Sequence, residues 1–122
     1  MIELDVQHLI QIEAAKIGMI LLRNNSGCLR DVTGREVRFG LGNDSKRVNE
    51  VRKSSDLIGW RHGRFCAVEC KAPGWRYRAK GREVAQLNFI NAVLRDGGFA
   101  CFATSWQDVY EALKENCGGM LD

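Results

Sequence analysis

The chain has 122 residues, 45% of them hydrophobic and 27% charged, and a formal net charge of +3 at pH 7. This length is typical of one domain, and the balance of apolar and charged residues excludes wholesale disorder. Apolar runs are far shorter than the roughly 20 residues of a membrane span, and the first residues lack the pattern of a secretory signal peptide. We therefore expect one soluble, cytoplasmic globular domain over residues 1–122.

Hydrophobic periodicity and turn residues predict the secondary structure. The expected elements are, in chain order, a helix over 6–17, a strand over 19–23, a hairpin of 28–31 and 36–39, a polar loop over 40–49, strands over 56–60 and 64–71, a helix over 82–96, a strand over 99–104 and a helix over 106–116. Asp5 is expected to cap the first helix, with Gly18 just beyond its end.

The connections between these elements predict a mixed sheet. A tight turn joins the strands at 56–60 and 64–71, which favours antiparallel pairing. A helix separates the strands at 64–71 and 99–104, as in a right-handed crossover between parallel strands. We therefore expect an α/β fold in which helices flank a mixed β-sheet.

Five cysteines are present, none in a Cys-x-x-Cys pair, and neither histidine has zinc-ligand spacing. We interpret the cysteines as small buried hydrophobic residues of a protein in a reducing compartment. No phosphate-binding glycine loop is present either, and we expect no organic cofactor.

A basic segment, KAPGWRYRAKGR at residues 71–82, carries five basic residues and no acidic one. Cationic side chains neutralise backbone phosphates, and interleaved aromatic rings can stack on bases or sugars. The alternative is a solvated loop whose charges only aid solubility. The candidate DNA-binding residues are Trp75, Arg76, Tyr77, Arg78, Lys80 and Arg82.

Polar residues also occupy strand positions where apolar ones are expected. Glu69 and Lys71 share one face of the strand at 64–71, with Cα atoms about 7 Å apart. Counting outward from the turn at His62 places Asp56 almost opposite Glu69. Two carboxylates on adjacent strands can bind Mg²⁺, and a nearby lysine can position a water or stabilise charge in the transition state. Taken alone, the same alternation also describes an ordinary half-exposed strand.

Two helical residues add to this set. Glu13 falls within the apolar stripe of the first helix, and Gln86 precedes Phe89, Ile90 and Val93 on the core-facing stripe of the later helix. A buried carboxylate or amide is costly without a partner, so a metal, a lysine or a bound water is expected beside each. An ordinary polar residue at the edge of each stripe would also fit.

The ordered set of Glu13, Asp56, Glu69-Cys70-Lys71 and Gln86 resembles the PD-(D/E)XK nuclease superfamily, and within it the virus-type replication-repair nuclease (VRR-NUC) domain. The matching stretches are SSDLIG (54–59), FCAVECK (65–71), EVAQL (83–87) and GGFA (97–100). Ser55 stands where the superfamily has a proline. The resemblance covers nearly the whole chain and implies a stand-alone nuclease domain with a restriction-endonuclease-like core, in αβββαβ order plus a C-terminal helix.

The resemblance also implies roles for these residues. Asp56, Glu69 and the backbone carbonyl of Cys70 would hold one or two Mg²⁺ or Mn²⁺ ions, with Glu13 as an additional metal or water ligand. Lys71 and Gln86 would orient the attacking water. Similar stand-alone nucleases look like archaeal Holliday-junction resolvases, which implies a homodimer that cuts four-way DNA junctions in a bacterial or phage-infected cell.

Two alternatives remain open. The chain could be a nucleic-acid-binding module of this fold without cleavage, although binding alone would not require Asp56, Glu69, Lys71 and Gln86 together. It could also be a nicking or restriction-type endonuclease on linear duplex, and nothing in the sequence separates that activity from junction cleavage.

Overall fold

The central sheet of the protein has four strands in a computed structural model that describes residues 2–116. They are β1 (Ile20–Arg23), β4 (Leu57–Arg61), β5 (Arg64–Cys70) and β6 (Phe99–Ala103), adjacent in that order. β1 pairs antiparallel with β4, β4 pairs antiparallel with β5, and β5 runs parallel to β6. Both expected strand pairings and the mixed α/β class are confirmed, and the architecture is compatible with a restriction-endonuclease-like core.

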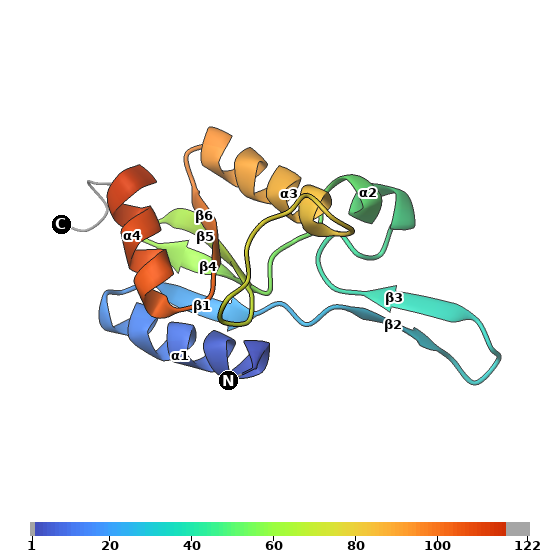
Figure 1. Ribbon diagram of the computed structural model, residues 1–122. Coiled ribbons are helices and arrows are strands. Elements are labelled where there is room, and N and C mark those ends of the chain that lie inside the picture. The colour runs from blue at the N-terminus through green and yellow to red at the C-terminus, as the bar shows by residue number, and fades with distance from the viewer. Residues whose placement is uncertain (1, 117–122) are drawn as a thin grey trace.

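Helices cover both faces of this sheet (Figure 1). On one face, α1 (Glu3–Lys16) and α4 (Trp106–Asn116) enclose the larger core, and on the other α3 (Glu83–Arg95) packs over β5 and β6. The hydrophobic core is divided into two clusters because side chains alternate between the two faces along β5. Val68 points into the larger core, and Ala67 packs under α3. No helix within residues 2–116 has the length and apolarity to cross a bilayer.

An insertion between β1 and β4 contains the expected hairpin. β2 (Gly27–Arg30) and β3 (Glu36–Phe39) pair antiparallel as a separate two-stranded sheet that projects from the body of the domain (Figure 1). With the insertion set aside, the order is α1-β1-β4-β5-α3-β6, followed by α4.

A short helix, α2 (Lys46–Val51), occupies part of the region that was expected to be a loop, so that expectation was wrong. The Ser45 hydroxyl accepts a hydrogen bond from the Val48 N–H at 3.3 Å, and Asn88 of α3 donates to the Val51 carbonyl at 2.8 Å. A helix of six residues is marginal on its own, so this cap and the contact with α3 account for its formation.

Helix α1 begins earlier than its hydrophobic pattern predicts. Ile2 is the N-cap and Asp5 lies in the first turn, so the expected Asp5 cap was wrong. Asp5 nevertheless accepts a hydrogen bond from the Ile2 N–H at 3.2 Å, which stabilises the helix start. Gly18 follows the helix end with φ of +78°, as expected of a left-handed residue there.

Candidate active site

Asp56 and Glu69 lie side by side where β4 begins and β5 ends. The register pairs Leu57 with Val68, so the next pair outward is Asp56 opposite Glu69. The Cys70 backbone N–H donates to Asp56 Oδ2 at 3.0 Å. In an extended strand the N–H and C=O of one residue point to the same side, so the Cys70 carbonyl also faces Asp56. The three groups expected to bind metal are therefore neighbours.

Burial and mutual proximity make this carboxyl pair electrostatically unusual. Glu69 is only 4% exposed. Its burial, followed by its hydrogen bond and charge contact with Asp56, raises the pKa of Glu69 to about 10, and the nearby Lys71 only partly opposes this. Such a pair is stabilised by a positive counter-charge.

The donor set fits a hard divalent cation. Mg²⁺ takes carboxylate and carbonyl oxygens and keeps several waters, so the carboxylates of Asp56 and Glu69 with the Cys70 carbonyl would suffice as protein ligands. Among residues 2–116, no group of three or more His, Cys, Asp or Glu side chains is placed to hold a metal. Any site here would rest on the carboxylate pair.

Lys71 follows directly on β5 and contacts α3. Its backbone N–H donates to the Ala103 carbonyl at 2.9 Å, which extends the parallel pairing with β6. Its Nζ donates to Gln86 Oε1 at 2.9 Å, and Gln86 is only 8% exposed. The expected polar partner of Gln86 is thus a lysine. The Lys71 Nζ also lies 5.4 Å from the Trp75 ring centroid, within cation–π range.

Asn24, just after β1, fixes the segment that carries Asp56. Its side-chain Nδ2 donates to Ser54 Oγ at 2.8 Å and to the Ser55 carbonyl at 2.9 Å. Its backbone N–H donates to the Asp56 carbonyl at 2.7 Å. Ser55, in the same segment, is buried at 1% exposure. Hydrogen bonds from Asn24 therefore hold this turn.

Two adjoining hollows open at the carboxylate pair, with volumes of about 240 and about 270 Å³. Both are lined by Asp56, Glu69, Arg82 and Gln86. We call them the hairpin-side and loop-side hollows. Further polar residues lining the hairpin-side hollow include Arg38, Asn43, Asn49 and Lys53. The loop-side hollow adds Glu3, Lys71, Lys80 and Glu83.

The hairpin-side hollow gathers positive charge. Burial, followed by repulsion from Arg82 and Arg38, lowers the pKa of Lys53 despite attraction to Glu69. Arg38 is fixed in place, since its Nε and Nη2 donate to the Asn43 carbonyl and side-chain oxygens at 2.7 and 2.8 Å. Three cations that line one hollow beside a carboxylate pair suit an anion such as a phosphate.

Glu13 lines neither of the two hollows, and the partner expected beside it is a lysine of its own helix. Its carboxylate bonds Lys16 Nζ at 3.0 Å one helical turn away, with 38% of the side chain exposed. It lines a different, apolar hollow together with residues such as Leu9 and Trp106. The carboxylate of α1 that does line the site is Glu3.

The basic segment folds back on the sheet. Trp75 packs on Phe102 with ring centroids 4.8 Å apart and donates from Nε1 to Glu83 at 3.1 Å. The Tyr77 ring lies 5.8 Å from Phe102, and the Arg78 backbone N–H donates to Glu83 at 2.8 Å. The two aromatic rings therefore anchor the segment, and their stacking on DNA remains a prediction. Its exposed cations are Arg76, Arg78, Lys80 and Arg82.

Sequence reasoning missed Glu3, Arg38 and Lys53. Lys53 lies in a short basic stretch three residues before Asp56, and this position was its only signal. Arg38 reaches the site only because the hairpin folds beside it.

No protein-family model and no curated protein matches this chain. The resemblance to the VRR-NUC domain therefore rests on the residues themselves.

Proposed function

We propose that this chain is a metal-dependent deoxyribonuclease of the PD-(D/E)XK type, similar to the VRR-NUC domain. Its active site, at Asp56 and Glu69, hydrolyses phosphodiester bonds of DNA. The observation that carries the proposal is the pairing of buried Glu69 with half-buried Asp56, with the hydrogen-bonded Lys71 and Gln86 beside them. A surface that only binds nucleic acid has no need of two adjacent carboxyl groups, because neither one attracts phosphates.

Each residue has a role in this proposal. Asp56, Glu69 and the Cys70 carbonyl would hold Mg²⁺ or Mn²⁺, which supplies a Lewis acid and lowers the pKa of a bound water. Lys71, held by Gln86, orients the water and stabilises negative charge on the phosphoryl oxygens. One water is consumed as its oxygen bonds to phosphorus and the P–O bond to the leaving sugar breaks. The products are one phosphate-bearing and one hydroxyl-bearing end.

Positive charge around the site supports DNA as the substrate. Lys53, Arg38 and Arg82 would bind phosphates on the hairpin side of the scissile bond, and Lys80 would bind them on the loop side. Branched DNA, a four-way junction in particular, is the proposed substrate in the cytoplasm of a bacterial or phage-infected cell. This choice follows the family resemblance.

The test compares labelled substrates of matched sequence: a four-way junction, a flap, a linear duplex and a single strand. Each is incubated with the protein in Mg²⁺, Mn²⁺ or EDTA. Metal-dependent cuts confined to the junction would support the full proposal, and equal cutting of linear duplex would support the nuclease while rejecting the substrate. Tight binding without cleavage in any metal would reject the nuclease in favour of a binding module.

A further inference from the structure

The hairpin of β2 and β3, residues 27–39, projects from the body of the domain beside the candidate active site (Figure 1). Its base belongs to that site, because Gly27, Cys28 and Arg38 line the hairpin-side hollow. Its tip extends into solvent, where Val32 is fully exposed. A lone two-stranded sheet is marginally stable in water, so the contacts that hold this one in place bear on its purpose.

Hydrogen bonds fix the base of the hairpin against the hollow. Asn43 Nδ2 donates to the carbonyls of Gly27 and Phe39 at 2.9 and 2.8 Å, and these two residues are paired across the strands. Gly40 follows with φ of +106°, and a Cβ at this position would collide with Ser26, just before β2. The residues around the hollow therefore set the direction in which the hairpin projects.

Further hydrogen bonds shape the tip. Asp31 Oδ1 accepts from the Thr33 N–H at 2.9 Å, from Thr33 Oγ1 at 2.7 Å and from the Arg35 N–H at 3.0 Å. Gly34 supplies the positive φ, +85°, that a tight hairpin turn requires, and Arg30 Nη1 donates to its carbonyl at 3.0 Å. A tip that is shaped before it meets a ligand loses little conformational entropy on binding.

The hairpin carries cations on both of its faces. Cys28 pairs with Arg38 and Arg30 pairs with Glu36, so the two arginines share the face that leads from the hollow. Arg35 precedes Glu36 and lies on the opposite face, and its side chain is exposed. The acidic residues are engaged within the hairpin, Asp31 in the turn and Glu36 at 3.8 Å from Arg38.

This shape and charge fit the major groove of duplex DNA. Two strands about 4.8 Å apart, with their side chains, fit a groove about 12 Å wide but not the minor groove of about 6 Å. Both walls of a groove are phosphate backbones, which suits cations on both faces of the hairpin. An apolar tip residue can contact the methyl group of thymine. Val32 lies four residues beyond Cys28, a span of about 13 Å or about four base pairs.

We propose that the hairpin enters the major groove of the DNA duplex that flanks the scissile phosphate, with Arg30 and Arg35 on the two backbones and Val32 against the bases. This inference rests on the proposed function, because it takes DNA as the ligand of the neighbouring carboxylate site. It adds that the DNA on the hairpin side of the cut is double-stranded for at least about four base pairs.

Fluorescence anisotropy of the full chain in EDTA, with a labelled duplex and a labelled single strand of the same sequence, tests the proposal. Joint replacement of Arg30 and Arg35 by alanine should weaken duplex binding about tenfold or more at about 0.1 M salt. The slope of log affinity against log salt should flatten by about 0.9 for each lost phosphate contact. Binding to the single strand should change much less, because it has no groove.

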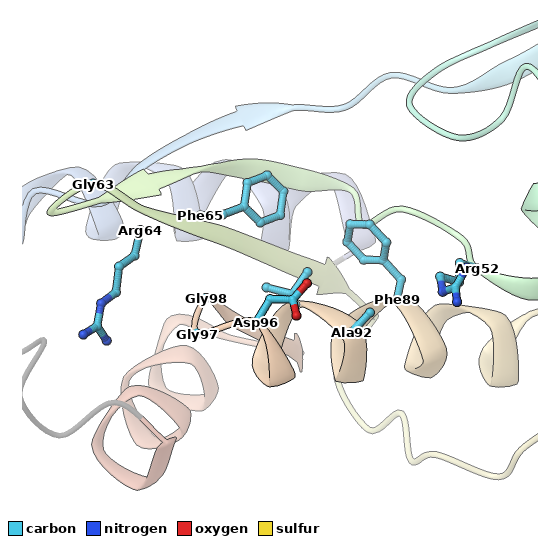
Figure 2. Close-up of a pocket in the computed structure, with 10 residues that line it drawn as sticks. Arg52, Gly63, Arg64, Phe65, Phe89, Ala92, Asp96, Gly97 and Gly98 are labelled. Atoms are coloured by element: carbon cyan, nitrogen blue, oxygen red, sulfur yellow. The ribbon is translucent and has the colours of Figure 1, made fainter.

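The matched control is the joint replacement of Arg64 and Arg95 by alanine, which removes two exposed arginines far from the hairpin. Arg64 lies at the start of β5 (Figure 2), the opposite end of that strand from Glu69, and Arg95 ends α3. This variant should bind both DNAs like the wild type. Equal duplex affinity of the two double variants, or an equal loss on duplex and single strand, would overturn the proposal.

Val32→Asp tests the tip without risk to the fold, because the side chain is fully exposed. It should weaken duplex binding about tenfold, whereas Asn91→Asp, which adds the same charge on the exposed side of α3, should not. Equal affinity of these two variants would overturn the contact between tip and bases. Since binding in EDTA requires no cleavage, hairpin-dependent binding by a protein that never cuts DNA would reject only the nuclease. Cleavage with hairpin-independent binding would reject only this inference.

Discussion

Lys71 Nζ donates a hydrogen bond to Gln86 Oε1 at 2.9 Å, which joins the end of β5 to the first turn of α3. The bond holds the ammonium group beside Asp56 and Glu69 instead of leaving the long side chain free in solvent. Gln86 thereby acts through Lys71 in the proposed reaction, as a positioning residue.

Gln86→Ala should lower the turnover of DNA cleavage about 10- to 100-fold while DNA affinity changes little, because only the placement of Lys71 is altered. Single-turnover cleavage and binding in Ca²⁺ would measure the two quantities separately. Asn91→Ala, at an exposed position of the same helix, is the control and should cleave like the wild type. Equal cleavage by both variants would remove Gln86 from the reaction.

Asn24→Ala should loosen the segment that carries Asp56. Three hydrogen bonds reach this segment from Asn24, and the substitution removes the two made by its side chain. We expect a stability loss of about 1–3 kcal/mol and a roughly tenfold weaker metal affinity. Urea denaturation and isothermal titration with Mn²⁺ measure these effects. Asn25→Ala, at the exposed neighbouring position, should change neither. A metal affinity unaltered by Asn24→Ala would mean that Asp56 does not depend on this turn.

Glu69 makes stability depend on pH when no metal is bound. Its pKa is raised from 4.5 to about 10 in the folded protein, so unfolding releases a proton and stability falls as pH rises between these values. Glu69→Gln removes this effect, so in EDTA the variant should melt at a higher temperature than the wild type at pH 8 and close to it at pH 5. Mg²⁺ should stabilise only the wild type. Thermal melts with parallel pH dependence for the two proteins would contradict this expectation.

Lys53 and Arg82 should contribute to DNA binding by neutralising backbone phosphates. Their joint replacement by alanine should weaken binding and flatten the slope of log affinity against log salt by about 0.9 for each phosphate that is no longer neutralised. Fluorescence anisotropy over a range of salt concentrations measures the slope. The control is the joint replacement of Lys16 on α1 and Lys114 on α4 by alanine, which lowers the net charge of the protein by the same amount. The same slope for both double variants would place the DNA surface elsewhere.

Local patterns predicted the strand part of the site. The turn around His62 sets the register of β4 and β5, so counting residues brought Asp56 to within one position of its partner Glu69. The apolar stripe of α3 likewise placed Gln86 on the core-facing side, where a polar partner was required.

The parts that depend on tertiary packing were not predictable in this way. Helical geometry places Glu13 within the apolar stripe of α1, yet its side chain is 38% exposed and pairs with Lys16. Glu3 precedes the hydrophobic pattern of α1, so periodicity gave no reason to place it at the site. Arg38 depends on how the hairpin lies against the sheet, and α2 depends on contacts with α3. None of these arrangements can be inferred from the spacing of residues in the sequence.

The most direct test of the proposed nuclease compares cleavage of a labelled four-way junction by the wild type, Glu69→Gln and Glu13→Gln in Mg²⁺ and in EDTA. We predict that the wild type and Glu13→Gln cut in Mg²⁺ at similar rates, whereas Glu69→Gln is slower by at least about 100-fold, because only Glu69 lies at the carboxylate pair. EDTA should abolish all cutting. Undiminished cleavage by Glu69→Gln, or cleavage that persists in EDTA, would contradict the central claim that this pair binds the catalytic metal.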